Sequence, residues 1–268
     1  MSERAAVPPP LPAQALPPLE LRPSAGRVFG GVWWLTFKQF ATVNQLLFTL
    51  GIMAVVFLVG FTATFRDTEH NFHGWLENFY FLLLAPLLVF VSSGGAMRDQ
   101  MKPAAADYIF TRPVRRWLYV IFRYIAQVAM LSLVYLPILA TALAVGVIRD
   151  IPEIIAYAPR LLGTQELLIL AVSGFGFFFG ALTSRYIVIG LAYGFIIEMG
   201  LGSIPTQIAR LSMSRHVRTL VEPFTENLTA SGTFAAVTTL IVFAVVTLAL
   251  AALIIQRHEF AGGRGKDV

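Results

Sequence analysis

Long uncharged blocks of apolar residues alternate with short polar segments along the chain. Blocks of about 18 or more apolar residues predict membrane-spanning helices, because a hydrocarbon core about 30 Å thick needs about 20 residues. Only helices and closed barrels satisfy their backbone polar groups there. The sequence therefore predicts an all-α polytopic membrane protein. Six spans are expected, at Leu46–Phe65, Phe79–Gly95, Leu118–Ile148, Leu167–Ser184, Tyr186–Ile204 and Phe234–Ile255.

Three of these spans have distinctive features. The second is short and contains Pro86, and the third is unusually long and contains Pro137. Only "SRY" separates the fourth span from the fifth. The charge at Arg185 predicts a tight turn between two spans, in place of one very long helix.

Lysine and arginine residues predict the orientation, since cytoplasmic loops carry an excess of them. With the N-terminus inside, fourteen of the twenty lie on the cytoplasmic side, so both termini are predicted to be cytoplasmic. Arg210, Arg215 and Arg218 are the main exception, because they fall in the last outer loop. A short amphipathic helix in that loop would account for them; its apolar residues would be Ile208, Leu211, Leu220 and Phe224.

The segments at the two ends differ from the spans. Residues 27–43 place aromatic and apolar side chains at helical spacing with Lys38 opposite, which predicts an interfacial helix along the cytoplasmic leaflet. Residues 1–26 are rich in proline and lack an apolar core, so they are expected to form a disordered tail and not a signal peptide. Residues 257–268 are expected to be a cytoplasmic tail, which leaves 27–256 as the membrane domain.

Composition agrees with this interpretation and excludes several functions. Hydrophobic residues make up 57% of the chain and charged residues 13%, against about a quarter charged in soluble domains. The net charge of +5 is interpreted as basic loops facing anionic lipid, and no nucleic-acid partner is expected. The absence of cysteine excludes disulfides, thiol catalysis and thiolate metal sites.

Charge is concentrated between the second and third expected spans, in "YIFTRPVRRWLYVIFRY" (residues 108–124). Residues 103–110 favour a short cytoplasmic helix, and Pro113 disfavours helix at Arg112. Arg115 and Arg116 then fall in the first turn of a long helix, where cations are mildly unfavourable. Anchoring to lipid phosphates explains the positive charge, and a docking surface for an acidic partner also explains the proline and Asp107.

This segment resembles the loop that precedes the third of six spans in the type-2 ATP-binding-cassette exporter permeases. The matching positions are Asp107, Tyr108, Thr111, Arg112, Pro113, Val114, Arg116, Trp117, Tyr119, Val120 and Tyr124. Arg115 replaces a residue that is usually small, Arg123 replaces the usual lysine, and Ala105-Ala106 stands where Gly-Thr is often found. The six spans, the interfacial helix and the C-terminal "RHEF" extend the resemblance over residues 27–260.

The resemblance implies that the region 97–117 couples the permease to a separate ATPase subunit. The residues expected to take part are Asp99, Asp107, Tyr108, Arg112, Pro113, Arg115, Arg116 and Trp117. It also implies an exporter of two permease and two ATPase subunits, with this chain as a homodimer or paired with a related permease. The complex would lie in a bacterial cytoplasmic membrane, in contact with lipid, with ATP and Mg²⁺ bound by the ATPase.

No enzyme motif is found in the chain itself. A phosphate-binding loop needs G-x-x-x-x-G-K-[ST], and "GGRGKD" at residues 262–267 lacks the spacing and the hydroxyl. An intramembrane serine protease is disfavoured, because no histidine lies in an expected span. His70 and His73 in the first outer loop are weak evidence for a metal, and no metal site is expected.

Glu198 and four glycines are the remaining candidates. Glu198 lies inside the fifth expected span, where it would line the translocation path or form a structural hydrogen bond. Small-xxx-small spacing allows close helix contact, within the subunit or in a dimer. The glycines with this spacing are Gly176, Gly180, Gly190 and Gly194. A gradient-driven transporter or channel is the alternative function, and Glu198 would then be central.

Overall fold

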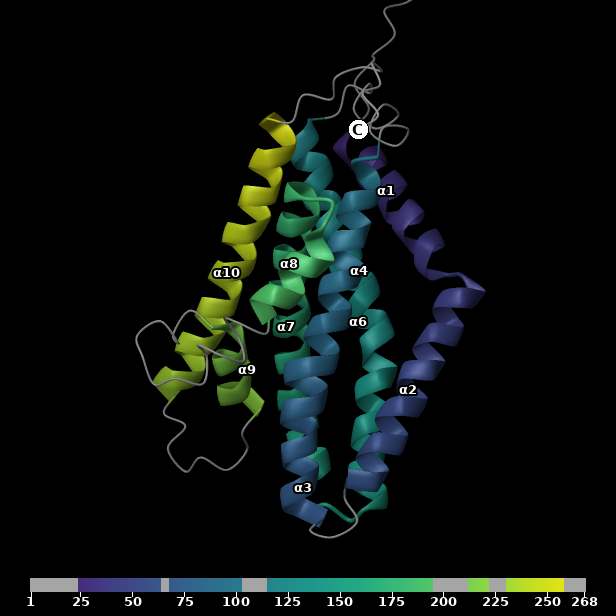
Figure 1. Ribbon diagram of the computed structural model, residues 1–268, viewed down its shortest axis with the longest axis vertical. Helices are drawn as coiled ribbons and strands as arrows, with labels where there is room; N and C mark the ends of the chain where they lie inside the picture. Colours follow the sequence, from purple (N-terminus) through teal and green to yellow (C-terminus); the bar gives the residue numbers. More distant parts are fainter. Residues whose placement is uncertain (1–23, 64–67, 103–114, 195–211, 222–229, 258–268) are drawn as a thin grey trace, which may run out of the picture.

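The computed structural model describes residues 24–63, 68–102, 115–194, 212–221 and 230–257. All regular elements in this part of the chain are helices, and most run along one long axis (Figure 1). They are α1 (Ala25–Phe40), α2 (Val43–Ala63), α3 (Thr68–Trp75), η1 (Leu76–Leu84), α4 (Ala85–Gln100), α6 (Arg116–Ile148), α7 (Ile154–Leu182), α8 (Tyr186–Tyr193), α9 (Met213–Val221) and α10 (Ala230–Arg257).

Five helical stretches of the described chain are long and apolar enough to cross a membrane, which indicates a multi-pass membrane protein. They are Val43–Ala63, Asn71–Gln100, Arg116–Ile148, Ile154–Leu182 and Gly232–Arg257. The fifth expected span is described only as far as α8 and Gly194, and residues 195–211 lie outside the described part. The expected turn before α8 is confirmed: Thr183 is extended, and its Oγ1 accepts a 3.1 Å hydrogen bond from the backbone N–H of Arg185.

The prediction that the second span is short is wrong. One continuous helical stretch of 30 residues runs from Asn71 to Gln100, because the aromatic residues before Phe79 are buried in the bundle. A π-helix, η1, occupies its middle and ends at Leu84, two residues before Pro86, with the backbone N–H of Ala85 bonded to the carbonyl of Tyr80. A proline clashes with the carbonyl four residues before it in a regular helix, so a wider turn there accommodates Pro86.

The fourth span also begins earlier than expected, at Ile154 instead of Leu167. The polar residues Arg160, Gln165 and Glu166 lower the hydropathy of its first half, but each of them has a hydrogen-bond partner elsewhere in the bundle. The resulting α7 is the most deeply buried of the five candidate spans. Helix α7 is therefore the centre of the bundle, in contact with α4, α6, α8, α9 and α10.

Glycines allow α4 and α7 to approach until their backbones touch. A Cβ atom on Gly180 would lie 2.3 Å from the carbonyl oxygen of Gly94, and one on Gly176 would lie 3.0 Å from the backbone nitrogen of Gly94. Real Cβ atoms do not make contacts as short as the first distance, and the second is tighter than most Cβ contacts. Gly176 and Gly180 thus lie at a helix contact within the subunit, which is one of the two uses considered for them.

The region expected to form the interfacial helix contains α1, which packs along the first half of α6 (Figure 1). Val32 lies in a small apolar cluster with Tyr119 and Ala126 of α6. A bend at residues 41–42 then leads into α2, most of whose surface is exposed in the single chain. Residues 1–23 and 258–268, which include most of the two expected tails, lie outside the described part.

We expect Gly180→Ala to destabilise the protein, because the new methyl group must displace the carbonyl of Gly94. Overpacking of this kind typically costs about 1–3 kcal/mol. Gly163→Ala is the matched control, since a Cβ at Gly163 in the same helix meets no atom of the described chain within 4 Å. Thermal unfolding in detergent measures both: the Tm should fall for Gly180→Ala only, and an unchanged Tm for it would contradict the described contact.

Candidate functional site

The region expected to couple to an ATPase is described at its two borders. At the end of α4, Asp99 forms an exposed ion pair with Lys102, with 2.7 Å between Oδ1 and Nζ. At the start of α6, Arg115 is the exposed N-cap residue, Arg116 is the first helical residue and Trp117 is 37% exposed. The other expected residues, Asp107, Tyr108, Arg112 and Pro113, lie outside the described part.

Direct contacts join the two borders. The Tyr119 hydroxyl of α6 donates a 3.0 Å hydrogen bond to Oε1 of Gln100, the last residue of α4, and both side chains are buried. Below this bond an apolar cluster joins four helices; it contains Met97, Met101, Val120, Tyr124, Phe177, Ala181, Ala251 and Ile255. A displacement of the connection between α4 and α6 would therefore reach α7 and α10 through packed side chains.

Arg123 is buried one turn further into α6. It is 1% exposed and is the largest fully buried side chain in the described chain. Its guanidinium donates to Oγ1 of Thr36 and to Oε1 of Gln39, both on α1. Thr36 uses its own hydroxyl proton on the carbonyl of Val32, at 2.7 Å, so its oxygen is a well-oriented acceptor.

The same end of the bundle is strongly basic. Its described cations outside the core are Arg27, Arg98, Lys102, Arg115, Arg116, Arg185 and Arg257. Asp99 is the one carboxylate on the described helix ends there, and it is already paired with Lys102. The surface attracts anions, either lipid phosphates or an acidic protein surface.

Polar side chains also meet in the middle of the bundle, where the sequence indicated none. The Tyr80 hydroxyl of η1 donates a 2.6 Å hydrogen bond to Oε1 of the fully buried Gln165. The Ser132 hydroxyl of α6 donates to a carboxylate oxygen of Glu166, which is half-buried. Towards the basic end, Ser93 donates to Ser173 at 3.0 Å.

Glu166 is an acid within a candidate membrane span, and it was not predicted as one because the fourth span was expected to begin at Leu167. It is the thirteenth residue of the 29-residue helix, and Ser132 is the central residue of α6. The pair therefore lies near mid-depth if both helices cross the membrane symmetrically. Its signal in the sequence is one carboxylate between the apolar stretches "IIAYAPRLLG" and "LLILAV". The expected acid Glu198 lies outside the described residues.

At the opposite end, arginines attach α9 to the bundle. Nε of Arg160 in α7 donates a 2.7 Å hydrogen bond to the carbonyl of Leu220, near the end of α9. Arg218 forms a 2.7 Å ion pair with Glu77 and donates to Asn78 of η1. The expected outer amphipathic helix is thus present at Met213–Val221, and Leu220 lies on its buried face; Ile208, Leu211 and Phe224 are outside the described part.

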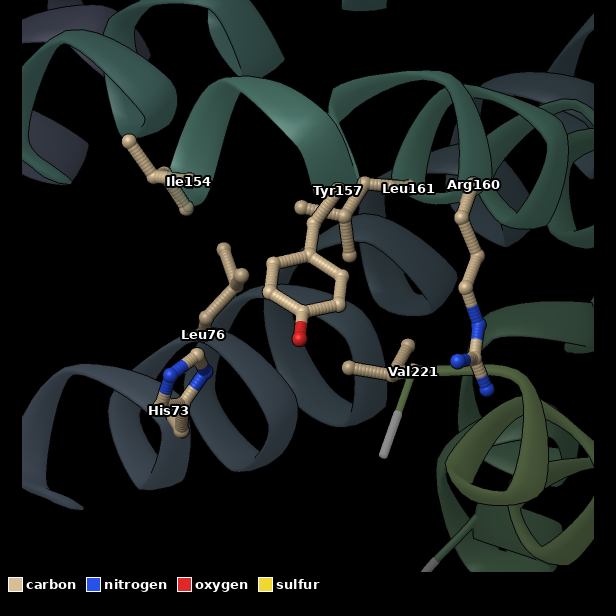
Figure 2. A pocket seen from close by; sticks show the side chains of 7 residues that line it. All are labelled: His73, Leu76, Ile154, Tyr157, Arg160, Leu161 and Val221. Carbon is tan, nitrogen blue, oxygen red and sulfur yellow. The ribbon is translucent and has the colours of Figure 1, made fainter. Parts of the chain in front are cut away.

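A narrow pocket lies where α3, η1, α7 and α9 meet (Figure 2). The Tyr157 ring lies between Leu76 and His73 on one side and Val221 on the other, while Arg160 extends towards α9. The remaining space holds at most about one water molecule. The pocket therefore belongs to the packing contact between α9 and the rest of the bundle, and it is too small for a substrate.

The two other glycines of the sequence analysis lie on or next to α8. A Cβ on Gly190 would lie 2.0 Å from the ring of Phe90 in α4, so Gly190 packs within this chain. A Cβ on Gly194 would meet no atom of the described residues within 4 Å.

Comparison of the chain with models of known protein families and with curated proteins finds no match.

We expect Tyr80→Phe to destabilise the protein by about 1–3 kcal/mol, because it leaves the buried Oε1 of Gln165 without its donor. Tyr135→Phe is the control, since Tyr135 is buried nearby and its hydroxyl makes no hydrogen bond in the described part. The Tm in detergent is the measurement. Equal Tm values for the two variants would show that the Tyr80–Gln165 bond contributes little.

Proposed function

We propose that the chain is the transmembrane subunit of a type-2 ATP-binding-cassette exporter. It would move a substrate out of the cytoplasm or inner leaflet, and a separate ATPase subunit would bind ATP and Mg²⁺. Two such permeases, identical or related, would form the membrane part of the complex. The motif in residues 107–124 is the observation that carries this proposal.

Two structural features support it. The motif connects two long helices whose ends are bonded to each other through Gln100 and Tyr119, so a push on the connection would move both helices. The surface around the connection is basic and suits an acidic partner. A lipid anchor alone requires the positive charge but not the bond between the two helix ends.

ATP binding at the partner would then act on residues 97–117 and shift α4 and α6 together. Because α4 is in backbone contact with α7 at Gly176 and Gly180, a displacement of α4 would also displace α7. The helices facing the second permease would rearrange in response, closing the path on the inside and opening it on the outside.

Affinity purification from native membranes tests the proposal. We expect a nucleotide-binding ATPase to co-purify with the tagged wild-type chain and to be lost when Arg112 and Arg116 are both changed to Glu. The charge reversal acts at the expected docking surface, where an acidic partner would now be repelled.

The matched control changes Arg185 and Arg257 to Glu, which alters the net charge equally at the same end of the bundle. This control should retain the ATPase, and the Tm of both variants should remain near the wild-type value. Absence of any ATPase from the wild-type preparation would contradict the exporter proposal. Loss from both variants would contradict a specific docking surface.

The Glu166–Ser132 pair favours one alternative, a transporter driven by an ion gradient. Carboxylates within spans commonly belong to proton or ion relays. Glu166 meets this description: it is half-buried, lies near mid-depth and is bonded to a hydroxyl of another helix. In this alternative the chain would act without an ATPase.

We expect Glu166→Gln to leave ATPase co-purification unchanged if the exporter proposal holds, because Glu166 is far along α7 from the basic end. Purified chain in liposomes with an imposed pH gradient and an internal pH-sensitive dye tests the alternative. A proton flux that is present in the wild type and abolished by Glu166→Gln would favour the gradient-driven transporter. Dye signals that are the same for the wild type, for Glu166→Gln and for empty liposomes would reject the gradient-driven transporter.

A further inference from the structure

Burial of the Arg123 charge requires an explanation beyond its position in the motif. A guanidinium removed from water loses several kcal/mol of hydration, and buried arginines are usually paired with a carboxylate. In the described part of the chain Arg123 has no such ion pair, and its two acceptors, Thr36 and Gln39, are uncharged. Both acceptors are on α1, so the hydrogen bonds of Arg123 attach that helix to α6.

If α6 crosses the membrane symmetrically, Arg123 lies near the level of the membrane boundary. Helix α6 has 33 residues and is about 50 Å long, so about 10 Å extends beyond each side of a hydrocarbon core about 30 Å thick. Arg123 lies seven residues after Arg116, about 10 Å along the helix axis. The two hydrogen bonds of Arg123 therefore attach α1 to the part of α6 nearest the basic end.

Further contacts place α1 and the start of α6 in one unit. The rings of Phe29 and Phe122 pack edge to face with centroids 5.3 Å apart, and Val32 contacts the cluster of Tyr119 and Ala126. Tyr119 in turn donates to Gln100 at the end of α4. One side of α6 therefore carries α1, and the same turns of α6 are tied to α4.

We propose that Arg123 is a positioning residue that fastens α1 to α6, so that α1 and the bend leading to α2 move with α6 as one rigid unit. This inference rests on the proposed function, since the motion is supplied at the connection between α4 and α6. Helix α2 packs on α6 and α3, and the bend at residues 41–42 joins it to α1. The α1–α2 bend would therefore carry the movement from the basic end to the most exposed span.

Distance measurements test the fastening on the isolated chain, and its lack of cysteine makes labelling unambiguous. Spin labels at Leu35→Cys on α1 and Ile125→Cys on α6 occupy exposed positions. Pulsed electron paramagnetic resonance should give one narrow distance in the wild-type background and a broadened distribution with Arg123→Met. A control pair at Ile125→Cys and Leu136→Cys, both on α6, should be unchanged. A narrow, unshifted α1–α6 distance in Arg123→Met would overturn the proposal.

A double-mutant cycle separates fastening from general packing. Thr36→Val removes one acceptor from a buried charge, so it should lower the Tm clearly in the wild-type background. In the Arg123→Met background the charge is gone, and the same change should have a much smaller effect. Equal Tm shifts in the two backgrounds would show that the guanidinium does not depend on Thr36, contrary to the proposal.

The complex tests the motion. With the ATPase bound, trapping of ATP should leave the Leu35–Ile125 distance unchanged in the wild type, as expected for a rigid unit. In Arg123→Met the ATPase should still bind, but the distance should now differ between the nucleotide-free and trapped states. A wild-type distance that changes on trapping would overturn the rigid unit. Failure of the wild type to bind an ATPase would overturn the exporter proposal. The tests on the isolated chain would still decide whether Arg123 fastens α1 to α6, because they need no ATPase.

Discussion

Backbone contact between α4 and α7 is the constraint on which the arrangement of the bundle depends. Gly94, Gly176 and Gly180 let the two helices approach until a single added methyl group would overlap a carbonyl oxygen. With no hydrophobic driving force between helices in lipid, such close van der Waals contact is a main source of association. Because α7 is also in contact with α6, α8, α9 and α10, its position relative to α4 determines where the other helices can pack.

This central contact is supplemented by polar bonds at three levels. Gln100–Tyr119 and Arg123–Thr36 lie at the basic end, Tyr80–Gln165 lies in the middle, and Arg160–Leu220 lies at the end that carries α9. Each joins residues that are distant in the sequence. Polar atoms at these positions would be costly if unpaired, so their partners restrict each helix to one rotation about its axis. The glycines thus determine the distance between helices, and the polar bonds determine their rotation.

The sequence predicted those parts of the fold that depend on local hydropathy. The third expected span began and ended within two residues of α6, because the few polar residues of this helix are isolated in an otherwise apolar sequence. The start of α7 was missed, since Arg160 and Gln165 are polar in the sequence but have partners that only the folded chain brings close. For the same reason Arg123 was counted among the cytoplasmic charges, although it is buried against α1. Hydropathy averaged over a window cannot distinguish a solvated arginine from one that is bonded inside the protein.

Because Arg123 is buried, it does not contribute to the attraction of anions that the arginines of the motif were expected to provide. A charge buried against α1 cannot attract lipid phosphates or an acidic partner, so the electrostatic attraction depends on residues such as Arg115 that remain exposed. Arg115 lies at the positive end of the α6 dipole, a position that costs about 0.3–1 kcal/mol for a cation unless an anion is near. Asp99, the carboxylate on the described helix ends there, is paired with Lys102. Exposed and buried arginines in this segment therefore have different roles. The exposed arginines suit an anion supplied from outside the bundle. The buried Arg123 connects α6, the helix on which that anion would act, to α1.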